Sequence, residues 1–380
     1  MRQGLTINSE MLKWSIQRAG WTLDDFISMF PKYKKWIEGE KYPSVRQLET
    51  FSEKVHIPFG FLFLQSPPIE KNPIAFFRTD KNSETALSPN TRDMILLLQK
   101  RQDWLRNYLI ESHNDPLKYV GQFKDSEDVI QIVNSIRDTL GLTKNISSQF
   151  KNSEEFYKYL IHKIEEIGIV LIFSGIYENN THRSIPLKDC RGFVLVDEYA
   201  PFLFININDS KSSQIFTLLH ELAHIWLGTT AGFDFEKMLP ADDPIEMICD
   251  KVAAEFLVPA EEFLKVWNNF PIQKIVKYLK VSEIVIMRRA FDLGKLSKVD
   301  FYSFYDRYAL KQSKRKKGSG GDFYSTNRKR LGKQYLNHIM NALKEGKLLY
   351  RDACKLTSLK GDTFQTLNTL GLFRELNENF

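Results

Sequence analysis

The feature that most constrains this chain is the sequence His220-Glu221-Leu222-Ala223-His224, which lies inside an apolar run from residue 215 to residue 227. In a helix, residues four apart share a face, so both imidazoles would point the same way. Two such imidazoles can bind one zinc ion, and the adjacent carboxylate of Glu221 can carry a proton. The motif therefore predicts a metal site suited to peptide hydrolysis.

The motif has a second interpretation, in which no metal is involved. Two histidines on a buried helix can be ordinary core residues whose ring nitrogens are satisfied by hydrogen bonds. A catalytic zinc site needs three protein ligands, so the metal interpretation depends on a third donor elsewhere in the chain.

A candidate third donor lies on a second predicted helix. Asp243 is a typical N-cap and Pro244 a typical first helical residue, so we expect a helix that begins here and ends before Pro259. Glu246 and Asp250 then lie one turn apart on the same side. In that arrangement Glu246 can bind the metal, while Asp250 accepts the free ring N–H of a ligating histidine.

Two alternatives concern this second helix. Glu246 is its third residue, where a glutamate often closes a capping box with the N-cap residue instead of binding a metal. Cys249 lies in the same turn, and a cysteine thiolate is also a good zinc ligand. We favour Cys249 as a small buried side chain packed among its apolar neighbours.

These motifs resemble the ImmA/IrrE family of metallopeptidases. The residues that carry the resemblance are 216–224 and 246–259, with the strand-like segments 191–195 and 201–206 before them. The resemblance implies a gluzincin-like site in which His220, His224 and Glu246 hold the metal and Glu221 is the catalytic carboxylate. At position 249 the family more often has alanine, so Cys249 adds a possible sensitivity to oxidation.

The resemblance also implies a cofactor and a substrate class. Zn²⁺ is the default for two imidazoles and a carboxylate, although manganese or iron could occupy such a site during expression. The implied substrate is a specific protein partner, a transcriptional repressor or antitoxin-like regulator, whose cleavage would control gene expression.

The N-terminal region, residues 1–66, is expected to be a bundle of short helices at residues 10–18, 23–29, 31–38 and 44–55. Two short helices joined by a tight turn follow the helix-turn-helix plan. The sequence Trp36-Ile37-Glu38-Gly39 followed by Pro43 resembles phage-repressor-type helix-turn-helix domains.

The third of these helices is the candidate DNA-binding element. Tyr33, Trp36 and Ile37 would face the core, which leaves Lys32, Lys34 and Lys35 able to reach a duplex. Lysines suit phosphates, whereas bases are usually read by Arg, Asn or Gln, so binding would be salt-sensitive and weakly specific. A docking module that binds no DNA is an equal alternative.

The rest of the chain predicts a mostly helical, multidomain α+β protein with a small mixed sheet. We expect a connector and long helix over residues 67–125, a zinc peptidase domain over 126–310, a basic Gly-rich linker over 311–321 and a helical C-terminal unit over 322–380. Strands are predicted at residues 169–173, 192–196 and 202–207. The strand at 192–196 is a candidate edge to which a substrate peptide could add.

The paired Arg288 and Arg289 are interpreted as packing residues, with nucleic-acid contact as the alternative.

Composition sets limits on the class of protein. With 43% hydrophobic and 26% charged residues, the chain has the composition of a globular protein. Its apolar runs are too short to cross a bilayer, and the first residues have no signal-peptide core, so we expect a cytoplasmic protein without membrane contact. Three scattered cysteines make a disulfide framework improbable. The net charge of +6 permits nucleic-acid contact without requiring it.

Two functions follow from these patterns. The first is a zinc endopeptidase that cuts a regulator, with the N-terminal domain as a possible DNA contact. The second is a DNA-binding regulator or docking protein whose metal site is structural or sensory. An intact Glu221 favours the enzyme, because a structural site does not need a proton-carrying carboxylate.

Peptide hydrolysis also needs a group that stabilises the oxyanion of the tetrahedral intermediate. The candidates are His182, Arg191 and Tyr199, and the sequence does not select among them.

Overall fold

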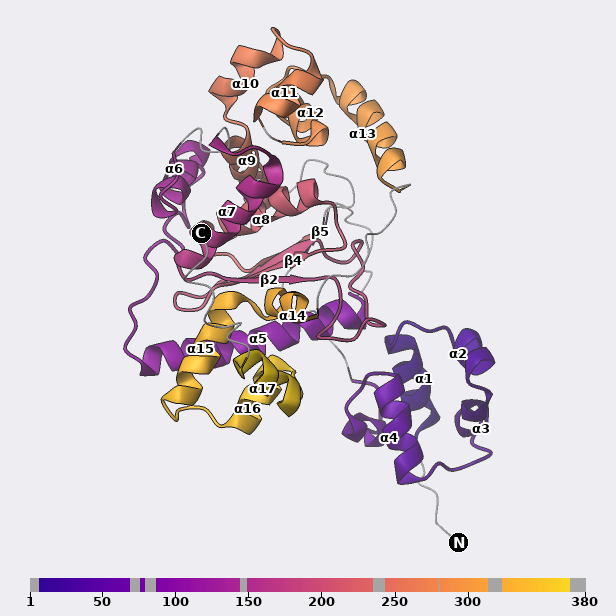
Figure 1. Cartoon of the computed structure of the whole chain (residues 1–380). Coiled ribbons are helices and arrows are strands. Elements are labelled where there is room, and N and C mark those ends of the chain that lie inside the picture. Colours follow the sequence, from indigo (N-terminus) through magenta and orange to yellow (C-terminus); the bar gives the residue numbers. More distant parts are fainter. Residues whose placement is uncertain are drawn as a thin grey trace. The chain divides into compact units, whose positions relative to one another are not determined.

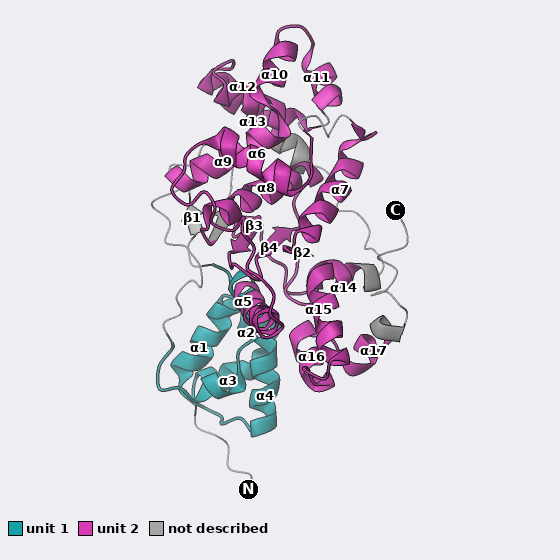
Figure 2. Cartoon of the chain, turned by 90° about the vertical axis from the view of Figure 1, so that its left-hand side faces the viewer, with its two compact units in different colours: residues 1–73, 85–93 teal, residues 74–84, 94–380 magenta. Residues whose placement is uncertain are grey.

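The structure is a computed structural model that describes residues 7–68, 76–78, 87–143, 149–234, 243–279, 281–313 and 323–369. The chain folds into two compact units, which Figure 2 shows in different colours. Unit 1 comprises residues 1–73 and 85–93, and unit 2 comprises residues 74–84 and 94–380. Of the predicted basic linker, residues 314–321 lie outside the described residues.

Unit 1 is a small helical bundle with an aromatic core. Its elements are α1 (Ser9–Arg18), α2 (Leu23–Met29), the 3-10 helix η1 (Pro31–Tyr33), α3 (Lys34–Ile37), α4 (Val45–Lys54) and the 3-10 helix η2 (Phe59–Phe63). Thr22 caps α2, and Ser44 forms a capping box with Gln47 at α4. The rings of Phe26, Tyr33 and Phe51 pack together at its centre. The predicted helices at 10–18, 23–29 and 44–55 are confirmed to within one residue.

The prediction of one continuous helix over residues 31–38 was wrong. The segment divides into η1 and the four-residue α3. Phe30 offers no side-chain acceptor at the start, and the first turn closes through the short bond from Tyr33 N to Phe30 O at 3.1 Å. The result is about one turn of α-helix, roughly 6 Å long.

Unit 2 is built on a mixed five-stranded sheet in the order β1-β5-β3-β4-β2. Its strands are β1 (Phe76–Arg78), β2 (Val170–Ser174), β3 (Gly192–Leu195), β4 (Phe202–Asn206) and β5 (Ala231–Asp234). The β1–β5 and β2–β4 pairs are parallel, whereas β3 is antiparallel to both of its neighbours. The three predicted strands are confirmed. The sequence did not indicate β1 or β5, because three or four residues show too little alternation to be recognised.

The prediction that β3 is an edge strand was wrong. Val194 pairs with Leu203 of β4 on one side and with Ala231 of β5 on the other. Both sides of β3 are therefore used within the sheet, and a peptide cannot add to it. The error arose because β5 follows α8 in the chain and then pairs with β3. Pairing between segments so far apart leaves no local sign in the sequence.

Helices cover both faces of this sheet (Figure 1). On one face, α8 (Lys211–Leu227) packs on β3 and β4, and α6 (Val129–Thr139) and α9 (Pro244–Leu257) pack on α8. The helix α7 (Ser153–Glu166) contacts β2. On the other face, Tyr335 of α15 (Lys333–Lys344) packs against Phe202 of β4 and against Trp104 of the long helix α5 (Pro89–Glu111).

The C-terminal helices belong to unit 2. They are α14 (Phe323–Leu331), α15, α16 (Tyr350–Thr357) and α17 (Gly361–Thr369). At the α14–α15 junction, Gly332 has a φ of +78°, and a Cβ there would lie 2.9 Å from the carbonyl oxygen of Leu171 on β2. Only glycine allows this close approach, which brings the junction against β2, the strand that ends the sheet.

A further set of helices follows α9. These are α10 (Ala260–Trp267), α11 (Ile272–Leu279), α12 (Glu283–Asp292) and α13 (Lys298–Ser313). Arg288 and Arg289 on α12 are each 5% exposed and form ion pairs with Asp250 and Glu255 of α9. Their interpretation as packing residues is confirmed. No helix in the described residues is long and apolar enough to cross a membrane.

Candidate metal centre

The helix α8 carries the motif through the middle of unit 2. Ser210 caps its start, and Gly228, with a φ of 71°, ends it in the left-handed region. Every residue from 214 to 227 is buried, which is typical of a helix enclosed on all sides. On β3, a Cβ at Gly192 would lie 2.5 Å from Thr217 and 3.3 Å from the side chain of Glu221. Glycine at this position therefore lets α8 lie close to the sheet beside the motif.

The helix α9 supplies the acidic groups. Asp243 caps it by accepting bonds from the backbone N–H groups of residues 245 and 246, and Pro244 is in the first turn, as predicted. The Glu246 carboxylate turns toward α8, where its oxygens lie 2.9 Å from His220 Nε2 and 3.2 Å from His224 Nε2. In this structure Glu246 faces the imidazoles, which argues against the capping-box alternative.

The three donor groups have the spacing of metal ligands. The Nε2 atoms of His220 and His224 are 3.2 Å apart, and each faces a different oxygen of Glu246, with Oε2 at 2.9 Å from His220 and Oε1 at 3.2 Å from His224. A tetrahedral zinc site with bonds of about 2.0–2.1 Å places neighbouring ligand atoms about 3.3 Å apart. The donors thus lie close to the positions that one ion would require.

The two histidines are oriented by different partners on their Nδ1 atoms. His220 Nδ1 lies 3.1 Å from Asp250 Oδ1, and the other oxygen of Asp250 lies 3.3 Å from Arg288 Nη2. His224 Nδ1 lies 3.0 Å from the hydroxyl of Thr229. In both cases an N–H on Nδ1 would leave Nε2 as the free donor for a metal. Sequence reasoning anticipated the Asp250 contact, but it missed Thr229 and the role of Arg288.

Glu221 stands apart from these pairs. It is fully buried, and neither of its carboxylate oxygens has a hydrogen-bond partner among the described residues. Burial raises the pKa of Glu221 well above its ordinary value; the charge of His220 opposes this shift and that of Glu246 adds to it. A buried acid without a partner is costly, so its presence fits a site that receives a further polar group. A water molecule activated by a neighbouring ion would provide one.

The remaining pKa shifts follow the same charges. Burial disfavours the charged form of His220, but Glu246 and Asp250 outweigh it and raise its pKa to about 10. For His224, burial dominates and lowers the pKa. Burial alone would raise the pKa of Glu246, but His220 and His224 lower it to about 2. The cluster therefore holds the Glu246 carboxylate in its charged form.

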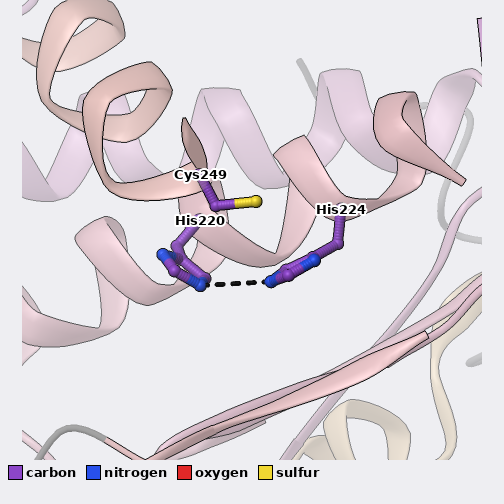
Figure 3. Close-up of side chains that lie close together, drawn as sticks. All are labelled: His220, His224 and Cys249. Carbon is purple, nitrogen blue, oxygen red and sulfur yellow. Dashed lines mark hydrogen bonds between the residues drawn. The ribbon is translucent and has the colours of Figure 1, made fainter. Parts of the chain in front are cut away.

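Cys249 is the other possible donor, and Figure 3 shows its sulfur beside the two imidazoles. Its Sγ and the two histidine nitrogens all lie within 4.8 Å of one another. The side chain is fully buried and belongs to the hydrophobic core, as expected. Burial, reinforced by Glu246 and Glu221, raises the pKa of the thiol well above its ordinary value, which disfavours the thiolate that binds metals. Glu246, in contrast, lies 2.9 Å and 3.2 Å from the two imidazoles, and both histidines lower the pKa of its carboxyl group.

The structure does not bring the three oxyanion candidates into this cluster. Arg191 forms an ion pair with Asp209, before the start of α8. His182 is exposed, and the backbone N–H of Tyr199 bonds to Asp197 in a turn. Within the described residues, no hydrogen bond joins any of the three to Glu221 or Glu246.

Comparison with known families finds a match over the part of the chain that holds this cluster. Residues 164–291, which include α8 and α9, match the IrrE N-terminal-like domain of the Peptidase_M78 family. The match supports the ImmA/IrrE family for this part of the chain. Residues 331–368 match a domain of unknown function, DUF8813. No curated protein matches the chain.

Proposed function

We propose that the protein is a zinc-dependent endopeptidase with a gluzincin-like core. His220, His224 and Glu246 are its metal ligands, and Glu221 is its catalytic carboxylate. The observation that carries the proposal is the convergence of three donor groups, 2.9–3.2 Å apart, beside a buried and unpartnered carboxylate. A purely structural site would not require that carboxylate.

The residues divide the chemistry between them. A zinc ion, when bound, supplies a Lewis acid that activates water and polarises a peptide carbonyl. Glu221 accepts the proton of the attacking water and then donates it to the departing amine. Asp250 and Thr229 keep the imidazole rings in place throughout.

The proposed substrate is a transcriptional repressor or an antitoxin-like regulator, cleaved in the cytoplasm to change gene expression. The support is the family resemblance together with unit 1, which we propose to be a helix-turn-helix domain. In unit 1, Lys32, Lys34 and Lys35 are exposed while Tyr33 and Trp36 are buried. These lysines could contact DNA phosphates near the site at which the regulator is bound.

The second candidate is a DNA-binding regulator or docking protein with a non-catalytic metal site. The length of α3 favours the docking form of this alternative, because a four-residue helix offers little surface to a major groove. Replacement of Lys32, Lys34 and Lys35 by glutamine tests the point. A DNA-binding unit 1 would lose affinity uniformly across sequences and show a smaller dependence on salt.

The decisive experiment compares wild type with Glu221→Gln, each co-expressed with a repressor-like protein chosen as the candidate substrate. We expect the intact partner to disappear only with wild type, while both proteins retain equal amounts of zinc. Glu255→Gln on α9 is a matched control, because Glu255 pairs with Arg289 and lies outside the donor cluster. Equal survival of the partner with wild type and Glu221→Gln would reject the peptidase and favour the regulator.

A further inference from the structure

A second charged site lies in unit 2, away from the metal cluster. It is a cavity of about 410 Å³ bounded by α7, β2, the first turn of α8 and the α14–α15 junction. Figure 1 shows α14 beside β2, where this junction meets the sheet. None of the four proposed catalytic and ligand residues lines the cavity. Its volume is within the range of pockets that hold small molecules.

The lining of this cavity is strongly basic. The basic residues are Lys158, Lys211, Arg328, Lys329 and Lys333, against only two acidic residues, Glu154 and Glu165. Lys158 and Glu154 pair with each other at 3.4 Å. In the part of the chain that the structure describes, the other four cations form no ion pair. Three come from the α14–α15 region and one from α8, so two separate segments direct positive charge into one space.

The environment makes this arrangement costly. Burial lowers the pKa of Lys211, and the charge of Lys329 adds to the shift. Burial also lowers the pKa of Arg328. Glu165, the nearby acid, has its pKa raised to about 7 by burial, although Lys333 and Arg328 oppose the shift. Partly buried cations without a counter-ion are stabilised when an external anion enters.

The cavity also has an apolar wall. Leu171 and Phe173 of β2 line it together with Ile161 of α7. Tyr157 is a further lining residue, and its buried hydroxyl has no hydrogen-bond partner among the described residues. A ligand that fills this space would therefore place a ring or chain on β2 and its anionic group among the cations.

We propose that this cavity binds a small-molecule phosphate monoester with an apolar or aromatic body. A phosphate carries up to two negative charges and three acceptor oxygens, which suits four cations better than a single carboxylate does. Bound there, the ligand would join the C-terminal helices to the first turn of α8, the helix that carries the metal motif. The binding site itself does not depend on the proposed peptidase activity.

The test uses full-length protein and 1-naphthyl phosphate as the probe, with titration calorimetry. We expect 1-naphthyl phosphate to bind more tightly than inorganic phosphate or 1-naphthol, because only the full probe uses both halves of the cavity. The triple variant Lys211→Gln, Arg328→Gln and Lys333→Gln should bind at least about 10-fold more weakly. The matched control removes three exposed lysines elsewhere in unit 2, Lys265→Gln, Lys344→Gln and Lys355→Gln, and should bind like wild type.

Two further measurements locate the site and guard against a misfolded variant. In wild type, the probe should slow amide hydrogen exchange in residues 154–161 and 328–336. Glu165→Gln removes an acidic group from the cavity and should tighten binding, whereas Glu166→Gln should not. Equal affinity of the two triple variants, binding of 1-naphthol as tight as that of its phosphate, or protection confined to the metal motif would each overturn the proposal.

Discussion

Two charged clusters touch the same helix, α8, and they are built in opposite ways. At its middle, His220 lies 2.9 Å from Glu246 and 3.1 Å from Asp250, two carboxylates on α9. All three side chains are at most 5% exposed. At its first turn, Lys211 lines the basic cavity together with Arg328 and Lys333, and none of the three forms an ion pair in the described residues.

The difference shows what each cluster requires from outside the chain. In the first, opposite charges offset the cost of burial, and the atoms that we propose as metal donors are held at fixed positions by their neighbours. In the second, positive charge is left uncompensated, and its stabilisation depends on an added anion. Four predictions test this contrast, beginning with the largest effect.

Removing a metal ligand should break the first cluster. Glu246→Ala deletes a donor that lies close to both imidazoles, so we expect zinc affinity to fall about 100-fold or more. Cys249→Ala removes the sulfur but leaves the two imidazoles and the carboxylate, so zinc affinity should change little. Competition with a chromophoric chelator measures both. If Cys249→Ala loses zinc and Glu246→Ala keeps it, the ligand assignment is wrong.

Weakening the contact between Asp250 and His220 Nδ1 should have the next largest effect on zinc affinity. Asp250→Asn keeps the shape of the side chain but removes the charge that His220 and Arg288 share, so zinc should bind about 10–100-fold more weakly. The matched control is Asp292→Asn, because Asp292 contacts Arg288 at 2.8 Å without being a partner of His220. The same chelator assay applies, and equal losses in the two variants would assign the effect to Arg288 alone.

His224 Nδ1 is held by one neutral hydroxyl, that of Thr229, so removing this contact should lower zinc affinity less than removing Asp250 does. Thr229→Val has nearly the same shape and removes the 3.0 Å contact with His224 Nδ1. We expect zinc affinity to fall by about 5-fold, the value of one neutral hydrogen bond. Thr229→Ser should restore it. A loss as large as that of Asp250→Asn would show that the two histidines are supported equally.

The smallest effect concerns pH and the basic cavity. Burial raises the pKa of Glu165 to about 7 in the folded protein, above its unfolded value, so the folded state binds the proton more tightly. The stability that this group contributes is present below about pH 4.5 and is lost as pH rises to about 7. Glu165→Gln should therefore melt roughly a few degrees above wild type at pH 8 but not at pH 4.5.

Glu166→Gln is the control for that measurement. Its carboxylate is exposed and paired with Lys163, which lowers the pKa of Glu166 instead of raising it. This variant should not gain stability between pH 4.5 and pH 8. If both variants respond alike, the pH effect does not arise from burial in the cavity.

Much of the local structure could be predicted from the sequence. The Asp243 cap with Pro244 placed the start of α9, because caps act within a few residues. The sheet was harder. β5 and β1 are too short for a periodic signal, and the pairing of β5 with β3 placed β3 inside the sheet. The Thr229 and Arg288 contacts were missed for a similar reason, since polar residues in a turn and on a separate helix give no local sign of their partners.

The sequence by itself determined that His220 and His224 share one face of α8, because helical periodicity is a property of neighbouring residues. It also determined that Glu246 and Asp250 lie one turn apart on α9. Only the tertiary structure decided that the two faces meet at donor spacing, that Glu221 is left without a partner and that cations from α8 and α14 line one cavity. These outcomes depend on the packing of segments far apart in the chain, where small shifts of a helix decide which side chains touch.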